Sequence, residues 1–336
     1  MFRSIIDEYE RYKPAPPAVL QTVPGPALFL DGGSGSGLAG QAMVRSGTLM
    51  GKLRGMDREN KAIAHIHGGN DIFMARFFPL FSGSSGNSAY FGSGDGGVLI
   101  DVGMSAKKTV LSLEHVGVSP ASLTAILITH EHIDHVRGLR VFAKKYRLPV
   151  YASPGTASAL REQGLIDETT PLIELGVDGI RTGALFVKPF HTSHDCRESY
   201  GYRMDLPDGR TAALATDLGY FSDEVRRGIS GCDLVMIESN HDVRMLQNGS
   251  YPYPLKRRIL SDIGHLSNDG CAQVLPGLIE AGSTRFVLGH LSRENNIPEL
   301  AYQTSLAELK THGMREHIDF ELTVAPRENS GGMTIF

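Results

Sequence analysis

The sequence predicts an α+β protein in which two β-sheets pack face to face and helices cover their outer sides, a four-layer αββα sandwich. Two observations lead to this fold class. Short apolar runs typical of strands are separated by helical segments from residue 77 to residue 324, and this pattern falls into two similar halves. Each sheet and each helix must bury an apolar face against another layer, so two such halves predict two sheets with helices outside them.

Residues 1–73 differ in composition from the rest of the chain. Prolines gather between Pro14 and Pro26, and a Gly/Ser run follows at 32–37, with no long periodic segment. This composition is typical of a flexible tail. We therefore expect residues 1–73 to be a disordered or non-native extension, with Met74 as an alternative or true start and one folded domain over residues 74–336.

The first half of the predicted domain begins with short strands that Gly/Ser-rich turns interrupt. The run Ser82–Ser88, which contains Ser84, predicts a tight turn, and presentation of its backbone N–H groups to an anion is the alternative. Strands are expected at 77–81, 89–91, 98–101, 124–129 and 149–152, and helices at 105–115, 136–146 and 156–163.

The second half repeats the pattern and contains a polar, Tyr/Pro-rich loop between residues 238 and 254. Strands are expected at 185–189, 199–204, 211–215, 234–238, 285–288 and 320–324, and helices at 223–229, 255–260, 268–281 and 299–312. Lys256, Arg257 and Arg258 in one of these helices predict a solvated helix face, with contact to a polyanion as the alternative.

The densest cluster of chemically active side chains is His130-Glu131-His132-Ile133-Asp134-His135, an H-x-H-x-D-H pattern. It lies where the 124–129 strand ends and the 136–146 helix begins, a usual place for a site in layered α/β proteins. His130 and His132 alternate along extended backbone and point the same way. Asp134 and His135 follow at the helix start and face a second point, so the spacing suits two metal ions.

Polar residues also follow several other predicted strands. Asp101, His194, Asp217 and His290 each stand at the end of an apolar run, as His130 does. In a two-sheet sandwich these strand ends converge on one edge. The sequence therefore predicts a single site built from distant segments.

Composition favours a cytoplasmic protein without a membrane anchor. The net charge is −4, so contact with nucleic acid must be local. The three cysteines are widely spaced and form no C-x-x-C, which fits a reducing compartment. We find no apolar run of about 18 residues and no signal-peptide layout.

The pattern H-x-H-x-D-H-x-x-G-L, which ends at Gly138 and Leu139, resembles the signature of the metallo-β-lactamase fold hydrolases. This resemblance implies the same αββα sandwich and a site for two divalent metal ions, Zn²⁺ or Mn²⁺. It implies that one metal is held by His130, His132 and His194, that the other is held by Asp134, His135 and His290, and that Asp217 bridges both. The true β-lactamases use a cysteine at the bridging place, so a lactamase is not expected.

The same resemblance suggests roles for residues around the metals. Asp134 is expected to orient the attacking hydroxide. Asp101 is expected to accept an N–H from a ligand imidazole and fix its tautomer, with an ordinary turn carboxylate as the alternative. His265, in a Gly-His-Leu-Ser segment, is expected to bind the phosphate or protonate the leaving oxygen. Its alternative role is to replace His290 at the second metal. His241 is expected to contact substrate or the loop of His265, with a structural histidine as the alternative, and Ser84 is a further candidate for substrate binding.

Four stretches, Ser82–Ser88, Glu238–Asp242, Gly264–Asn268 and Leu288–Asn296, are similar to the YycJ (WalJ) branch of this superfamily. The resemblance covers roughly residues 76 to 326. It implies a dinuclear metal-dependent hydrolase, a phosphodiesterase or 5′-to-3′ exonuclease that cleaves DNA by attack of metal-bound hydroxide and holds it through phosphate contacts. The alternative is a hydrolase of the same fold acting on a small cyclic phosphodiester or a thioester. A non-catalytic role is disfavoured because all seven predicted ligands are intact.

Overall fold

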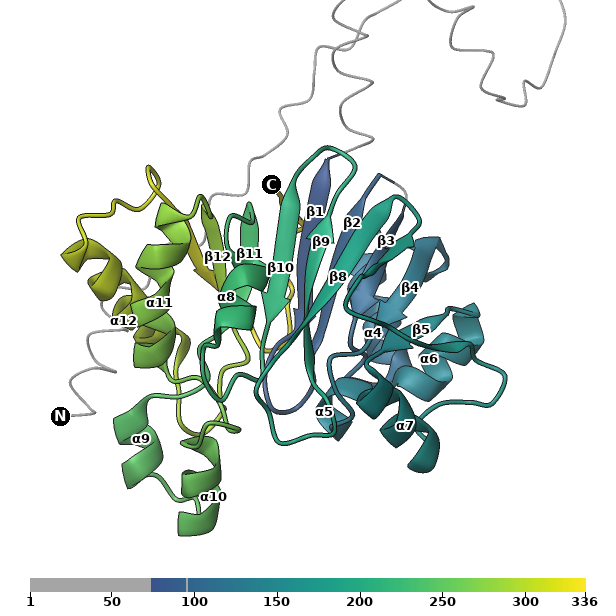
Figure 1. Cartoon of the computed structure of the whole chain (residues 1–336), viewed down its shortest axis with the longest axis horizontal. Coiled ribbons are helices and arrows are strands. Elements are labelled where there is room, and N and C mark those ends of the chain that lie inside the picture. Colours follow the sequence, from purple (N-terminus) through teal and green to yellow (C-terminus); the bar gives the residue numbers. More distant parts are fainter. Residues whose placement is uncertain (1–73, 95) are drawn as a thin grey trace, which may run out of the picture. The chain divides into compact units, whose positions relative to one another are not determined.

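The computed structural model describes residues 74–94 and 96–336. The predicted extension over residues 1–73 lies outside the described residues. Two seven-stranded sheets make up the centre of the described part (Figure 1).

The first sheet has the strand order β14-β1-β2-β3-β4-β5-β6. Its strands are β1 (Ala75–Phe81), β2 (Ser88–Ser93), β3 (Gly96–Ile100), β4 (Leu123–Leu127), β5 (Val150–Ala152), β6 (Leu172–Glu174) and β14 (Thr334–Ile335). The helices of this half are α4 (Ala106–His115), the short 3₁₀ helix η2 (Pro120–Ser122), α5 (Ile133–Val136), α6 (Leu139–Tyr146) and α7 (Pro154–Glu162).

The second sheet has the order β13-β12-β11-β10-β9-β8-β7. Its strands are β7 (Ile180–Thr182), β8 (Leu185–His191), β9 (Tyr200–Asp205), β10 (Thr211–Ala215), β11 (Leu234–Glu238), β12 (Arg285–Gly289) and β13 (Glu321–Val324). Its helices are α8 (Asp223–Ile229), α9 (Val243–Asn248), α10 (Tyr253–Ile259), α11 (Asn268–Glu280) and α12 (Pro298–Thr311).

The central core lies between the two sheets, and the alternation of side chains along each strand creates it. In β3, Val98 and Ile100 face this core, whereas Leu99 faces the helices outside. In β10, Leu214 faces the central core and Ala213 faces the other outer layer. Fully burying one Val, Leu, Ile or Phe side chain stabilises a fold by about 1.5–3 kcal/mol. Because successive side chains along a strand point to opposite sides, each sheet has two apolar faces. Each of these faces must be covered by another layer.

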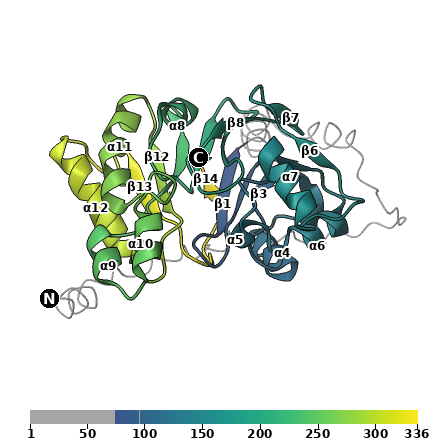
Figure 2. The same cartoon turned by 60° about the horizontal axis from the view of Figure 1, so that its bottom comes forward.

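Helices supply those outer layers. Leu113 of α4 and Phe142 of α6 pack on the first sheet, and Leu275 of α11 and Leu309 of α12 pack on the second. Figures 1 and 2 show α11 and α12 on one side of the two sheets and α4, α6 and α7 on the other. The predicted αββα sandwich is confirmed.

The structure corrects several predicted boundaries. The helix expected at 136–146 begins three residues later, as α6 at Leu139, and the short helix α5 precedes it, separated at Arg137 and Gly138. The Gly138 N–H donates to Val102 O at 2.8 Å instead of continuing a helix. The predicted polar loop before residue 254 contains α9, which Asp242 caps by accepting from the Met245 N–H at 2.7 Å. The short strands β6, β7 and β14 were not predicted, because two or three residues carry no period.

Strand direction brings the predicted site to one edge. β3 and β4 run parallel, as do β10, β11 and β12, so their carboxyl ends share an edge of each sheet. β8 pairs antiparallel with β9, and β9 pairs antiparallel with β10, so β8 also ends there. Within the described residues, no helix combines the length and the apolar character needed to cross a membrane.

Candidate active site

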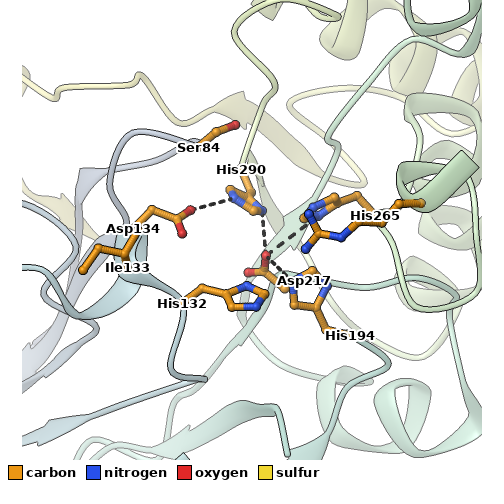
Figure 3. A pocket seen from close by; sticks show the side chains of 9 residues that line it. Ser84, His132, Ile133, Asp134, His194, Asp217, His265 and His290 are labelled. Carbon is orange, nitrogen blue, oxygen red and sulfur yellow. Dashed lines mark ion pairs between the residues drawn. The ribbon is translucent and has the colours of Figure 1, made fainter. Parts of the chain in front are cut away.

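The strand-end residues predicted from the sequence meet at this edge. Figure 3 shows His132, His194, Asp217, His265 and His290 pointing toward one another from separate segments. The cavity between them has a volume of about 330 Å³. It is lined by Ser84, His132, Ile133, Asp134, His194, Asp217, Arg258, His265 and His290.

Three of the site residues adopt left-handed backbone conformations just after a strand. The φ angles are 60° at Asp101, 58° at Asp217 and 57° at His290. Non-glycine residues adopt this conformation at a cost of about 1–3 kcal/mol, and it concentrates at functional sites. At His290 the turn is held by the Ser82 hydroxyl, which accepts the His290 N–H at 2.7 Å, and by Asn240, which donates to the His290 carbonyl at 2.8 Å.

His130, His132 and His194 form the first group able to hold a metal ion. One ligand atom from each lies within 4.8 Å of the others. The ring centroids of His130 and His132 are 4.5 Å apart, and those of His132 and His194 are 5.1 Å apart. His132 is the N-cap of α5 and makes no side-chain capping bond, so its imidazole is free to face the cavity.

Asp134, His135 and His290 form a second group with the same spacing. His135 is fully buried, and its Nδ1 lies 2.8 Å from Asp101 Oδ2. Asp101 also accepts from the N–H and the hydroxyl of Thr129, each at 2.8 Å. Asp101 therefore has the contacts expected of a residue that orients a ligand imidazole.

Asp217 lies between the two groups. Its Oδ1 is 3.7 Å from His194 Nε2 and 3.3 Å from His290 Nδ1, and its Oδ2 is 3.6 Å from His135 Nε2. Asp217 also belongs to a further ligand-capable group with His130 and His135. This placement is the one a bridging carboxylate requires.

Glu238 is a site residue whose contacts sequence analysis missed. It is fully buried, and its Oε1 accepts from His265 Nδ1 at 2.9 Å and from His290 Nδ1 at 2.8 Å. Its Oε2 accepts the N–H groups of Leu218 at 2.7 Å and Leu266 at 3.1 Å. Glu238 stands at the end of β11. A polar residue at the end of a strand is the same signal that identifies Asp101, His194 and Asp217 in the sequence.

Asn87 is a second missed residue. Its Oδ1 accepts the Gly83 N–H at 2.9 Å, and its Nδ2 lies 3.0 Å from His135 Nε2 and 3.3 Å from Asp134 Oδ2. It thereby connects the Gly/Ser-rich turn to the second ligand group. A lone asparagine in a turn gives no signal of this contact in the sequence.

His265 and His290, the two alternatives for the second metal, both reach the site but have different neighbours. The ring centroids of His265 and His290 are 5.3 Å apart. His290 Nε2 lies 4.0 Å from Asp134 Oδ2, and His290 joins the group of Asp134 and His135. His265 instead groups with Asp217, Glu238 and His290. The geometry therefore favours His290 as the partner of Asp134 and His135.

The structure does not bring His241 into the cavity. This side chain is 1% exposed, does not line the cavity, and neither of its ring nitrogens has a hydrogen-bond partner. Burial lowers its pKa to about 4. His241 instead contacts the loop of His265, because its carbonyl accepts the Asn268 N–H at 2.9 Å, whereas Ser84 lines the cavity.

Two buried atoms in the site test whether cations fit. His130 Nε2 and Asp217 Oδ2 are buried and have no hydrogen-bond partner among the described residues. A buried polar atom without a partner costs about 1–3 kcal/mol. Both belong to ligand-capable groups, so a divalent cation would supply the missing partner, and the donor set of imidazoles and carboxylates is one that binds such ions.

Histidines and carboxylates of the site shift one another's pKa values. Burial alone would lower the pKa of His135, but the carboxylates of Asp217, Asp101 and Asp134 raise it to about 10. His130 is also buried, and burial and the neighbouring histidines lower its pKa well below the ordinary value. The pKa of Asp217, which burial would raise, is held well below its usual range by the surrounding histidines. The histidines thus favour the ionised form of the Asp217 carboxylate, and the nearby carboxylates favour the charged form of His135.

The comparisons with known proteins define the class. A family profile described as Beta-lactamase superfamily domain matches residues 97–291, more than half of the chain. The chain therefore belongs to the β-lactamase superfamily, and its sandwich is the metallo-β-lactamase fold that the H-x-H-x-D-H motif predicted. The predicted enzyme class, a metal-dependent hydrolase of this fold, is confirmed.

Two curated relatives are similar over most of their length. The chain is 39% identical over 247 residues to the exodeoxyribonuclease WalJ of Streptococcus pneumoniae, which covers 72% of this chain and 91% of that protein. It is 38% identical over 247 residues to the exodeoxyribonuclease YycJ of Bacillus anthracis, which covers 73% of this chain and 93% of that protein. The predicted resemblance to this branch is confirmed.

Solved structures support the fold alone. The metallo-β-lactamase fold protein YhfI of Bacillus subtilis superposes with a TM-score of 0.56 at 18% identity, over 79% of this chain and 100% of that one. The short form of human tRNase Z superposes with a TM-score of 0.52 at 17% identity, over 77% of this chain and 98% of that one.

Proposed function

We propose that this chain is a metal-dependent 5′-to-3′ exodeoxyribonuclease that holds two divalent cations, Zn²⁺ or Mn²⁺, between its two sheets. One observation carries the proposal: two ligand-capable groups meet in one cavity, with Asp217 within 3.7 Å of a nitrogen from each group. The similarity to two exodeoxyribonucleases over nearly their full length supports DNA as the substrate.

The ligand assignment follows the groups. His130, His132 and His194 would hold one cation, and Asp134, His135 and His290 the other, with Asp217 shared. When bound, two such cations lower the pKa of a water molecule and offset the charge of the attacked phosphate.

Protein side chains supply the remaining chemistry. Asp134 lines the cavity and accepts a hydrogen bond from the attacking water, which orients it. Glu238 accepts the Nδ1–H of His265 at 2.9 Å and fixes the orientation of this ring. His265 lines the cavity, where it would bind the phosphate or protonate the leaving oxygen.

Location is a separate prediction. The three cysteines, Cys196, Cys232 and Cys271, are free thiols in the described part of the chain. This agrees with the expected reducing compartment. The cytoplasmic location stays a prediction.

The test is a substrate panel with the full-length protein and Mn²⁺ or Zn²⁺. End-labelled 5′-phosphorylated duplex DNA, single-stranded DNA, RNA and bis-p-nitrophenyl phosphate would be compared. We expect nucleotides to be released from the 5′ end of duplex DNA, and His132→Ala to lower this rate by at least about 100-fold. Hydrolysis of bis-p-nitrophenyl phosphate without cleavage of any nucleic acid would instead favour the small-molecule alternative.

A further inference from the structure

We propose that Arg258 binds a phosphate of the substrate strand next to the one being hydrolysed, and that Asp195 is its positioning residue. This inference rests on the proposed nuclease function and names a binding residue for it. It starts from the composition of the cavity wall. Among the described side chains that line the cavity, Arg258 is the single lysine or arginine.

Asp195 fixes the orientation of the Arg258 guanidinium. The two Asp195 carboxylate oxygens accept from Arg258 Nε and from Arg258 Nη2, the latter at 2.8 Å. An arginine has five N–H donors, so two of five are used and three remain. No protein acceptor is seen for Nη1 in the described part of the chain. A guanidinium held on one side and free on the other is suited to bidentate binding of a phosphate.

Backbone contacts hold this pair against the predicted metal ligands. Asp195 directly follows His194, and its N–H donates to Ile263 O at 3.1 Å. His194 Nδ1 lies 3.0 Å from Gly264 O, and the Ser193 hydroxyl donates to Asp262 O. The segment that follows α10 is therefore fixed on the loop that carries His194. The position of Arg258 relative to the site is set by these contacts and does not depend on substrate.

Exposure separates Arg258 from the metal ligands. The side chains of His194 and Asp217 are each 2% exposed, whereas that of Arg258 is 50% exposed. The ligands thus lie at the base of the cavity and the guanidinium at its rim. A scissile phosphate held by cations at the base places the neighbouring phosphate of the same strand toward the rim.

Other basic residues of α10 do not share this position. Lys256 Nζ donates to the carbonyls of Gln247 at 2.9 Å and Gly249 at 2.7 Å. Arg257 does not line the cavity. The sequence alone gave all three basic residues the same prediction, a solvated face, and the structure distinguishes Arg258.

The experiment compares Arg258→Gln with Arg257→Gln, which removes the same charge from the same helix, in the full-length chain. For Arg258→Gln we expect the KM for 5′-phosphorylated duplex DNA to rise about 10-fold or more, with kcat changed less than about threefold. The slope of log KM against log salt should fall by about one, as for the loss of one phosphate contact. Turnover of bis-p-nitrophenyl phosphate, which has a single phosphate, should fall less than turnover of DNA.

Two further variants test the geometry. Arg258→Lys keeps the charge without the planar fork, so its KM should lie between wild type and Arg258→Gln. Asp195→Asn keeps the Arg258 guanidinium but no longer holds its orientation. The KM for DNA should therefore rise less than in Arg258→Gln, and the slope of log KM against log salt should stay that of wild type.

Several results would overturn the proposal. Equal KM values for Arg258→Gln and Arg257→Gln, or an unchanged salt slope, would show that Arg258 is not a phosphate contact. An equal loss of activity on DNA and on bis-p-nitrophenyl phosphate would place it on the scissile phosphate instead. Wild-type protein without activity on any nucleic acid would overturn the nuclease function itself, and this inference with it.

Discussion

At the scale of single residues, Glu238 positions two histidines of the site, His265 and His290. Its two oxygens accept four hydrogen bonds, two from imidazoles and two from backbone N–H groups, and the side chain is fully buried. Burial would raise its pKa, but His265 and His290 lower it to about 2, so it stays ionised. Because the Glu238 carboxylate accepts the Nδ1–H of both histidines, it fixes the tautomer of each ring. The Nε2 atom of each ring then remains available to contact a metal ion or the substrate.

We predict that Glu238→Gln impairs catalysis without unfolding the protein. The glutamine amide has one acceptor oxygen, and its NH₂ group would face N–H donors on the other side. Turnover should fall about 10–100-fold, the usual cost of losing a residue that orients a metal ligand. Steady-state kinetics together with metal content per chain would measure this.

Asp233→Asn is the matched control for this variant. Asp233 precedes the opposite end of the same strand and accepts the Thr211 N–H at 2.8 Å, far along β11 from the site. Equal turnover of Glu238→Gln and Asp233→Asn would show that the Glu238 carboxylate does not contribute to catalysis.

At the scale of elements, two loops interlock around α5. The Asn87 N–H donates to Asp134 O, the Gly103 N–H to Asn87 O, and the Val102 N–H to His135 O, each at 2.8 Å. A Cβ added at Gly103 would lie 1.7 Å from Asp134 O and 2.4 Å from Asn87 N. Only a glycine allows the backbone at residue 103 to come this close to Asp134 and Asn87. Gly103 therefore fixes the positions of Asp134 and His135.

We predict that Gly103→Ala displaces α5. Both clashing atoms belong to backbone, so the loop must move, and overpacking of this kind destabilises by about 1–3 kcal/mol. Urea denaturation would measure the free energy of unfolding, and turnover should fall as well. Gly176→Ala is the control, because a Cβ there meets nothing within 4 Å. Equal stability of the two variants would contradict the prediction.

A histidine outside the metal site links β8 to α8. His191 Nδ1 lies 2.9 Å from Glu224 Oε1, and its Nε2 lies 3.2 Å from Glu198 Oε1. Burial would lower the pKa of His191, but these two carboxylates raise it above the ordinary value. The charged imidazole is therefore favoured in the folded state.

We predict a pH-dependent stability difference between wild type and His191→Gln. Because the folded pKa is raised, the contribution is fully present below about pH 6.5 and is lost as the pH rises through the folded value. Urea unfolding at a series of pH values should show the largest advantage of wild type near pH 6 and a smaller one near pH 9. A constant difference across this range would exclude the charged pairing.

At the scale of the whole molecule, the site joins the two sheets. His130 and His132 follow β4 of the first sheet, whereas His194 follows β8 of the second. The apolar core between the sheets is independent of the site and includes Phe77 and Phe91, whose ring centroids are 4.7 Å apart. Cations bound at the site would therefore cross-link two halves that the apolar core already joins.

We predict that removal of metal lowers the Tm without unfolding the protein. Metal at 100 times its Kd stabilises by about 2.7 kcal/mol. For a domain of this size that corresponds to roughly 5–10 °C. Thermal unfolding with EDTA and with added Mn²⁺ or Zn²⁺ would show the shift, and His132→Ala should show a smaller one. A Tm that does not respond to metal would argue against ligands shared between the sheets.

The sequence by itself determined the sandwich, the order of its longer strands and helices, and the cluster of candidate ligands at His130–His135. Each of these rests on local pattern: the period of apolar residues, and the position of a polar residue after a strand. The same rule selected Asp101, His194, Asp217 and His290, and the structure brings all of them to one edge.

Tertiary structure alone decided the contacts between distant segments. It placed His290 beside Asp134, put Glu238 between His265 and His290, buried His241, and separated Arg258 from its helical neighbours. Glu238 and His290 are 52 positions apart, and Arg258 and Asp195 are 63 apart. Strand order and loop packing bring these distant residues together, and neither produces a periodic pattern in the sequence.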